Sequence, residues 1–268
     1  MLIQSASLQG IRESNEDEHI IIQNLSSTKK DLNNINLLGV FDGHGGGLVS
    51  KFLKENLYKY FLKKNKNPIF KDNKTTIKYI HNVYNHLQNK IKKEKYSRYS
   101  GSTALVAIQS KYRKKNSLWV INTGDCRSVI CNRYNIAVQL TKDHKPNSLE
   151  ERKRILGLNG KINFDGDDWR VKDLSLSRAF GDTDATPFVT HQPQIYKYKL
   201  SNSDKFMILA CDGLWDVLSN QEVVNFILEY KNKIDPEKDN INIAQKLAQF
   251  AIDSGSSDNI TIILGFFN

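Results

Sequence analysis

The chain has 268 residues, of which 39% are hydrophobic and 25% charged, and its formal net charge is +10. This composition is ordinary for a globular protein with a substantial core, and no apolar run approaches the roughly 20 residues that a membrane-spanning helix requires. The first residues lack a basic segment followed by an apolar one, so a secretory signal is not expected.

Part of the positive charge lies in lysine-rich clusters at residues 63–66, 92–95 and 111–115. Solvated loops and helix faces account for such clusters. Because no nucleic-acid-binding motif accompanies them, we do not expect a nucleic-acid partner. Because no apolar run is long enough to span a bilayer, we do not expect a membrane partner either. The three cysteines, Cys126, Cys131 and Cys211, have neither metal-site spacing nor a disulfide pattern. We therefore expect an intracellular protein, cytoplasmic or nuclear, and take a monomer as the default.

The chain begins with two predicted strands. Residues 3–8 alternate polar and apolar side chains before a glycine turn. A charged segment, Arg12 to His19, then precedes the apolar residues 20–22, which form the second predicted strand. Two carboxylates, Glu16 and Asp17, therefore lie just before this strand.

The third predicted strand, residues 35–41, ends at Asp42-Gly43-His44, and more glycines follow. Glycine lets the backbone approach a ligand closely, a carboxylate suits a hard cation, and an imidazole can carry protons. A strand that ends in a tight Asp-Gly turn has the same pattern. The stretch alone does not decide between a turn and a site.

Two amphipathic helices are predicted next. The apolar residues of the first repeat every four positions, at Val49, Leu53, Leu57 and Phe61. Those of the second alternate steps of three and four, at Ile77, Ile80, Tyr84, Leu87 and Ile91. Both patterns are typical of a helix that packs one face on a sheet.

From residue 103 onward most predicted elements are strands. We expect hairpins that pair residues 103–109 with 118–122 and residues 128–131 with 136–140. Further strands are predicted at residues 194–198, 206–210 and 260–266, and helices at residues 148–156, 223–228 and 243–252. Ser148, with Glu151 three residues later, predicts a capping box. Because helices come in pairs and strands in runs, we predict one α+β domain over residues 1–268, with two antiparallel sheets and helices outside.

Carboxylates recur at the strand boundaries. Asp42 and Asp212 each end a strand and precede a glycine, Asp125 follows a strand, and Asp258 lies just before the last one. If these side chains converge at one edge of the sheets, cations must neutralise them, and oxygen ligands favour Mg²⁺ or Mn²⁺ over zinc. Two such ions can activate a water and hold a phosphoryl oxygen. Asp-Gly pairs are also common turns, so each one alone is weak evidence.

Eight segments, in order along nearly the whole chain, resemble the metal-dependent protein phosphatase family of type 2C, also called PPM. They are Arg12-Glu13-Ser14-Asn15-Glu16-Asp17, Val40-Phe41-Asp42-Gly43-His44-Gly45-Gly46, Gly101-Ser102-Thr103-Ala104, Asn122-Thr123-Gly124-Asp125-Cys126-Arg127, Leu140-Thr141-Lys142-Asp143-His144-Lys145-Pro146, Leu176-Ser177-Arg178-Ala179-Phe180-Gly181-Asp182, Ala210-Cys211-Asp212-Gly213-Leu214-Trp215-Asp216 and Ser257-Asp258-Asn259-Ile260-Thr261. The resemblance implies a central β-sandwich of two antiparallel sheets flanked by helices on both sides. It also implies hydrolysis of phosphoserine and phosphothreonine in proteins, by attack of a water that bridges two Mg²⁺ or Mn²⁺ ions.

The resemblance also implies the metal ligands. Asp42 is expected to bridge two metals, and the carbonyl of Gly43 to bind one of them. Asp212 and Asp258 are expected to hold the second metal. Glu16 is expected to support the metal cluster.

Further roles follow from the same resemblance. Asp17 is expected to lie behind the metal ligands, and Asp125 and Asp216 match positions that hold a third, weaker metal in some members. Arg12 is expected to bind the substrate phosphate, because a guanidinium can hold two phosphate oxygens at once. His44 is expected to be the general acid for the leaving serine or threonine oxygen.

The chain departs from the family pattern at one place. Members carry an asparagine-glycine turn before the Ser-Arg-Ala motif, whereas residues 170–174 here are expected to run straight through, one residue shorter. The preceding loop or flap, residues 159–173, is short and carries the acidic run Asp165-Gly166-Asp167-Asp168. The substrate is expected to be a phosphoprotein, with acidic surroundings favoured by the positive charge. We expect the chain to be little more than a catalytic domain. A fragment of a longer protein would have the same sequence features.

Rival functions fit the residues less well. The three cysteines lack an arginine six residues later, which a cysteine-based phosphatase requires. Asp182-Thr183-Asp184-Ala185-Thr186 fits the short motif of aspartyl-phosphate enzymes, but no apolar strand precedes it. The alternative function is a catalytically weak relative that regulates or scaffolds by binding phosphoproteins. Because such relatives lose metal carboxylates and this chain keeps them, we favour the enzyme.

Overall fold

The computed structural model describes residues 1–25, 35–61, 70, 72–112, 115–233 and 241–267. The lysine cluster at residues 63–66 lies outside this part of the chain, as does the centre of the cluster at residues 111–115.

Two five-stranded antiparallel sheets form the middle of the molecule. The first has the order β1 (Leu2–Leu8), β15 (Ile260–Phe266), β14 (Phe206–Ala210), β8 (Arg127–Cys131) and β9 (Ala137–Gln139). The second has the order β13 (Gln194–Lys199), β7 (Lys115–Thr123), β6 (Ala104–Tyr112), β3 (Ile35–Phe41) and β2 (Glu18–Ile22).

The two sheets pack face to face because their strands alternate in side-chain direction. In β3, Leu38 and Val40 enter a cluster that both sheets share, with Met207 and Leu209 from β14 on the opposite side. The intervening residues of β3, such as Leu37, belong to the cluster on the outer face of the second sheet. Since successive side chains of a strand point to opposite faces, every central strand contributes to two cores.

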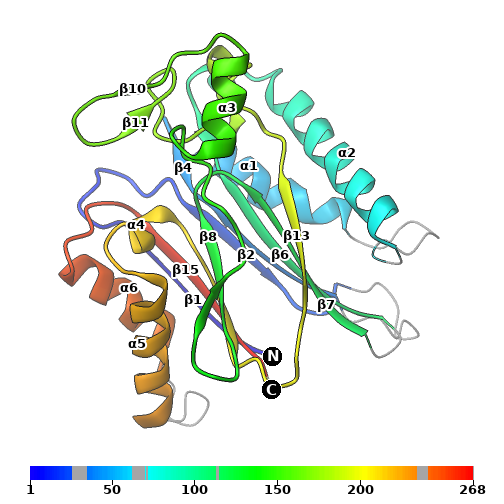
Figure 1. The fold of residues 1–268 in the computed structure, drawn as a ribbon, viewed down its shortest axis with the longest axis vertical. Helices are drawn as coiled ribbons and strands as arrows, with labels where there is room; N and C mark the ends of the chain where they lie inside the picture. Colours follow the sequence, from blue (N-terminus) through cyan, green and yellow to red (C-terminus); the bar gives the residue numbers. More distant parts are fainter. Residues whose placement is uncertain (26–34, 62–69, 71, 113–114, 234–240, 268) are drawn as a thin grey trace.

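Helices cover both outer faces of the sandwich, as Figure 1 shows. The second sheet is covered by α1 (Leu48–Asn56), a 3-10 turn (Leu57–Tyr60) and α2 (Asn73–Ile91), and the first by α5 (Asn220–Lys233) and α6 (Ile243–Asp253). This confirms the predicted α+β fold with antiparallel sheets and helices on both sides. None of the described helices is long and apolar enough to cross a membrane.

The predicted apolar stripe of α2 was wrong at its first residue. Ile77 is 38% exposed, whereas Thr76 is buried. The Thr76 hydroxyl accepts a hydrogen bond from the Phe70 amide and donates one to the Asp72 carbonyl. Thr76 therefore takes the inward position at the start of the helix, because its polar group is satisfied locally.

The predicted capping box of α3 (Leu149–Gly157) was also wrong. Ser148 precedes the helix but makes no side-chain capping bond. The Glu151 carboxylate, which is buried, instead accepts hydrogen bonds from Arg154, Arg178 and the Ser177 hydroxyl. Burial alone would raise the pKa of Glu151, but the two guanidiniums outweigh it and lower the pKa to about 2. Hydrogen bonds between charged groups are stronger than a bond to a backbone amide, which explains the choice of partner.

The flap, residues 159–173, contains a small hairpin of β10 (Asn163–Phe164) and β11 (Trp169–Arg170) at one end of the sandwich (Figure 1). After it, Val171 and Leu174 exchange two backbone hydrogen bonds of 3.0 and 3.1 Å. The residues between them, Lys172 and Asp173, have left-handed φ angles of 50° and 68°. The expectation that residues 170–174 run straight through was therefore wrong, since a tight turn is kept with two side chains in a conformation that usually favours glycine or asparagine.

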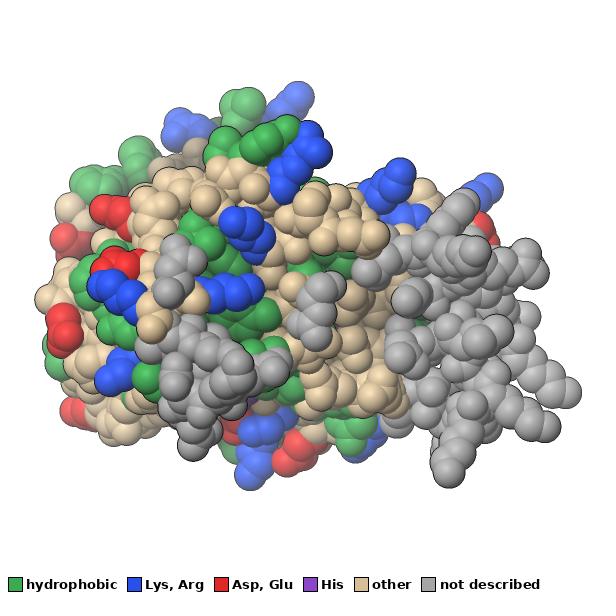
Figure 2. Space-filling view, turned by 90° about the horizontal axis from the view of Figure 1, so that it is seen from below, with side chains coloured by type: hydrophobic (Ala, Val, Ile, Leu, Met, Phe, Trp, Pro, Cys, Tyr) green, Lys and Arg blue, Asp and Glu red, His purple; other side chains and the backbone are tan. Residues whose placement is uncertain are grey.

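The flap and the termini lie at opposite ends of the sandwich (Figure 1). A short sheet of β4 (Gly43–His44), β5 (Gly101–Ser102) and β12 (Phe180–Gly181) lies toward the flap end. Figure 2 views the other end, where Lys and Arg side chains are dispersed among neutral, apolar and acidic ones over the described surface.

Candidate metal centre and active site

Asp42 is placed by the alternation of β3. Leu38 and Val40 point between the sheets, and Asp42 continues the same spacing just beyond the end of the strand. Its backbone is fixed by Thr103, whose hydroxyl accepts from the Asp42 amide at 3.0 Å and whose amide donates to the Asp42 carbonyl at 2.8 Å. The Asp42 carboxylate is therefore held at the flap end of the sandwich interior.

Asp42 meets carboxylates that come from distant parts of the chain. Asp125 follows β7, and Asp212 begins the short helix α4 (Asp212–Trp215) after β14. One carboxylate oxygen each of Asp42, Asp125 and Asp212 lies within 4.8 Å of the other two. Atoms of Asp17, Asp42 and Cys211 form a second such group behind them. The convergence predicted from the strand ends is therefore present for Asp17, Asp42, Asp125 and Asp212.

This concentration of acidic groups perturbs their ionisation. Burial and the neighbouring carboxylates raise the pKa of Asp42 well above its usual range. Burial raises the pKa of Asp17 to about 7, and burial with the charge of Asp212 raises that of Asp216 to about 7. Burial also raises the pKa of Asp125. In each case the ionised form is disfavoured because no counter-charge is sufficient.

The donor set fits a hard divalent cation. Both carboxylate oxygens of Asp17 and the Oδ1 atom of Asp125 are buried and have no hydrogen-bond partner among the described residues. Unpaired buried oxygens are costly unless a ligand satisfies them. The Cys211 sulfur, in contrast, already contacts the Thr261 amide and the Asn259 carbonyl, and burial raises the pKa of its thiol well above the usual range. The carboxylates, rather than the thiol, are therefore the candidate ligands.

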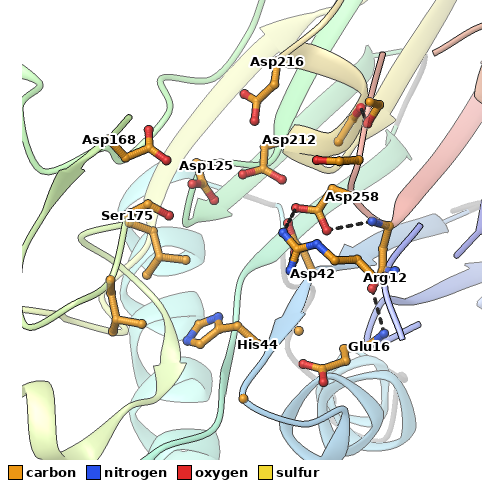
Figure 3. A pocket seen from close by; sticks show the side chains of 18 of the residues that line it. Arg12, Glu16, Asp42, His44, Asp125, Asp168, Ser175, Asp212, Asp216 and Asp258 are labelled. Atoms are coloured by element: carbon orange, nitrogen blue, oxygen red, sulfur yellow. Dashed lines mark hydrogen bonds and ion pairs between the residues drawn. The ribbon is translucent and has the colours of Figure 1, made fainter. Parts of the chain in front are cut away.

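Asp258 lies two residues before β15, on the Arg12 side of the cluster (Figure 3). The Arg12 guanidinium contacts the Asp258 Oδ2 atom at 2.8 Å and is 58% exposed. The loop that carries Arg12 is tied down by Asn259, whose side chain donates to the carbonyls of Gln9 and Ser14 and accepts from the Glu16 amide. Arg12 is thus held at the rim of the cluster with its guanidinium open to solvent.

Glu16 stands apart from the other carboxylates (Figure 3). Its Oε2 atom accepts a hydrogen bond of 2.9 Å from the Gly46 amide, and its backbone carbonyl accepts one of 2.6 Å from the Ser50 hydroxyl. A Cβ atom on Gly43 would lie 2.3 Å from the same carbonyl, so only glycine fits there. In this structure Glu16 contacts the glycine loop, and its expected metal role stays a prediction.

His44 is paired with Asp182, to which sequence reasoning assigned no role. The His44 Nε2 atom lies 2.8 Å from the Asp182 Oδ2 atom, and Asp182 is buried. A Cβ atom on Gly101 would lie 2.0 Å from that oxygen and 2.5 Å from Nε2, so glycine is what allows the pair. Burial alone would lower the pKa of His44, but the hydrogen bond and charge of Asp182 outweigh it, and the pKa is raised. The only available signal was that Asp182 ends one of the eight matching segments.

Lys145 is a second site residue that the sequence did not reveal. Its Nζ atom lies 2.7 Å from the Asp125 Oδ2 atom and 3.3 Å from the Asp212 Oδ2 atom. Burial would lower its pKa, but the charges of Asp125 and Asp212 outweigh this effect and raise it. Lys145 also belongs to a matching segment, yet nothing in that segment indicated that its ammonium lies among the carboxylates.

Most of these groups line one cavity of about 740 Å³, whereas Asp17, Cys211 and Asp182 lie behind its wall. Figure 3 shows Asp42, Asp125, Asp212 and Asp258 around it, with Asp216 beyond them, His44 on one side and Arg12 on another. Asp168 and Arg170 reach the same cavity from the flap. The arrangement combines a cluster of oxygen donors, an exposed guanidinium and a histidine whose pKa is raised by Asp182. It can bind divalent cations and an anion next to a proton donor.

Comparisons of the sequence identify similar proteins. The chain matches the family described as protein phosphatase 2C over residues 1–260. It is 38% identical over 265 residues to "Probable protein phosphatase 2C 7" of Oryza sativa subsp. japonica. This match covers 97% of this chain and 64% of the rice protein. It is 39% identical over 238 residues to "Probable protein phosphatase 2C 59" of Arabidopsis thaliana, which covers 87% of this chain and 71% of that protein. The chain thus spans less than two thirds of the rice relative.

Solved structures share the fold. A "C.elegans sex determining protein" matches with a TM-score of 0.87 and 26% identity, over 100% of this chain and 65% of that one. A phosphatase from a pathogenic strain of Toxoplasma gondii matches with a TM-score of 0.80 and 21% identity, over 99% of this chain and 92% of that one. The second likeness concerns the fold alone.

Proposed function

Because the chain belongs to the protein phosphatase 2C family, we propose that it is a metal-dependent protein serine/threonine phosphatase. The observation that carries the proposal is the convergence of Asp42, Asp125 and Asp212 within 4.8 Å, where the buried Oδ1 atom of Asp125 has no hydrogen-bond partner in the described part of the chain. The plant relatives are named probable protein phosphatases, and the family match covers residues 1–260. The substrate would be a phosphoserine or phosphothreonine side chain of a protein.

The residues fit two Mg²⁺ or Mn²⁺ ions, which prefer carboxylate and carbonyl oxygens. Asp42, the carbonyl of Gly43, Asp212 and Asp258 would hold them, and Asp17 would orient these ligands from behind. When bound, the ions would neutralise the carboxylates, polarise the phosphoryl group and lower the pKa of water.

The remaining steps belong to the chain's own side chains. Arg12 would hold two phosphate oxygens, since its guanidinium is exposed at the rim and contacts the Asp258 carboxylate, which a cation would otherwise neutralise. His44 would donate a proton to the leaving serine or threonine oxygen, and Asp182 would keep it protonated and oriented. This division needs no nucleophilic residue and leaves no covalent bond between the chain and phosphate.

The test is phosphate release from a phosphothreonine peptide by the purified, chelator-treated chain. We expect turnover when Mn²⁺ or Mg²⁺ is restored and none in excess chelator. Asp42→Asn, which keeps the size of the side chain and removes its charge, should abolish turnover, while Asp253→Asn on α6 should not. Equal rates with and without metal would refute the proposal. If the chain binds phosphopeptide but shows no turnover under any metal condition, the catalytically weak relative is the correct reading.

A further inference from the structure

Lys145 lies inside a cluster otherwise made of carboxylates. Its ammonium contacts the Asp125 Oδ2 atom at 2.7 Å and the Asp212 Oδ2 atom at 3.3 Å. The side chain is 26% exposed, whereas that of Asp125 is 2% exposed. Arg127, which also lies at this end, is engaged by Asp143 and Asn220 instead. Lys145 is therefore the cation that the structure pairs with Asp125.

The cavity on this side is strongly acidic. Four carboxylates lie around this part of the cavity (Figure 3), those of Asp125, Asp168, Asp212 and Asp216. Asp216 follows α4, and Asp168 reaches in from the flap. Asp125 uses one oxygen for Lys145, and its other oxygen, Oδ1, is buried without a hydrogen-bond partner among the described residues. This outer position, defined here by Asp125, Asp212 and Asp216, is thus suited to a cation and only partly satisfied by the lysine.

We propose that Lys145 is a built-in cation that competes with a divalent metal for the outer position and so sets its occupancy. The inference rests on the proposed function for the ions at Asp42, and it adds what controls a further ion. An ammonium and a divalent ion that share the carboxylates of Asp125 and Asp212 repel each other. Either cation can neutralise these carboxylates, so the presence of one weakens the binding of the other. Occupancy of the outer position therefore requires Lys145 to move away or to be outcompeted.

The test is calorimetric titration of the chelator-treated chain with Mn²⁺. For the wild-type chain we expect two tight equivalents and a weak third. Lys145→Met, which keeps the length and removes the charge, should bind the third equivalent at least tenfold more tightly. Lys145→Arg should behave as the wild type because the charge is kept. Lys142→Met is the matched control, since Lys142 is exposed and pairs with Glu150 at the surface.

Two further variants make the outcome decisive. Lys145→Gln keeps a hydrogen-bond donor for Asp125 without the charge, so it should show the same gain even if Lys145→Met does not fold without metal. Adding Asp125→Asn to Lys145→Gln should remove the gained equivalent. The inference is overturned if Lys145→Gln binds Mn²⁺ with the number and affinity of the wild type. If the wild-type chain binds no tight Mn²⁺ at all, the proposed function itself fails.

Discussion

Asp42 is held in a position that disfavours its ionised form, although that form is the one that would bind a cation. Its backbone is fixed by Thr103 at the end of a buried strand, which places the half-buried carboxylate in the cavity among other acidic groups. Burial and neighbouring carboxylates raise its pKa well above the usual range, so the isolated site favours the protonated form. A divalent cation reverses this preference, and metal binding should therefore release protons.

Asp17 allows this electrostatic account to be tested without any substrate. Burial raises its pKa to about 7, so the folded chain keeps a proton that the unfolded chain releases near pH 4. The stability that this proton provides is present below the unfolded pKa and is lost as the pH rises through about 7. In Asp17→Asn that loss is absent. In chelator, the stability of the wild type relative to the variant should therefore fall by on the order of 2 kcal/mol between about pH 5 and about pH 8.

The measurement is urea unfolding of both proteins at the two pH values. Comparing the two proteins cancels the titration of groups that do not interact with Asp17, such as His144, whose pKa burial lowers to about 4. A difference in unfolding free energy that does not change with pH would show that Asp17 is ionised in the folded chain.

Asp182 is predicted to tune the proton donor. Its charge and hydrogen bond raise the pKa of His44 against the effect of burial, so Asp182→Asn should lower that pKa. Because the protonated form would be the active one, the basic limb of the kcat/KM profile on a phosphothreonine peptide should move to lower pH. Asp184→Asn is the matched control, since Asp184 pairs with Arg98 at the surface. An unmoved basic limb in Asp182→Asn would argue against His44 as the general acid.

At the scale of single residues, the sequence was informative where a carboxylate ends an apolar strand. Asp42 and Asp212 stand out for that reason, because strand alternation fixes where the next side chain points. Asp182 and Lys145 carry no such signal. Their side chains reach the site from loops, and they contact residues that lie 138 and 20 positions away in sequence.

At the scale of elements, α3 is attached to the site end through Glu151. Its carboxylate is buried between Arg154 and Arg178, so Glu151→Gln leaves two guanidiniums without their counter-charge. Removing one partner from a buried ion network typically costs about 3 kcal/mol of unfolding free energy. Glu150→Gln, one residue earlier, removes an exposed pair with Lys142 and should leave stability nearly unchanged. Thermal or urea unfolding compares the two, and equal effects would show that the Glu151 network contributes little.

Long elements were predictable and short ones were not. The helices around Val49 and Ile80 are long enough to show a period, and the strands around Leu38 and Ile208 are recognisable as almost continuous apolar runs. The two-residue strands β4, β5 and β12 have none, although they position His44 beside Asp182. The predicted capping box was wrong for a related reason. The pattern considers only neighbouring residues, whereas Arg178, which donates to the Glu151 carboxylate, lies 27 residues away.

At the scale of the whole molecule, the site exists because the sandwich brings distant strand ends together. β1 pairs with β15 from the other end of the sequence, and β14 lies between β15 and β8. The run of predicted strands indicated antiparallel sheets, but which strands are neighbours depends on contacts that no local pattern encodes. The carboxylates of Asp42, Asp125 and Asp212, which follow β3, β7 and β14, therefore become one cluster only in the folded chain. Asp258, just before β15, lines the same cavity.

The most direct test of this cluster is anomalous diffraction from crystals of the chain grown with Mn²⁺. We predict two manganese peaks at the flap end of the sandwich, next to the carboxylates that would hold the ions, those of Asp42, Asp212 and Asp258. No manganese peak next to Asp42 at saturating Mn²⁺ would contradict the account, whereas a weaker third peak at the outer position of Asp125, Asp212 and Asp216 would not.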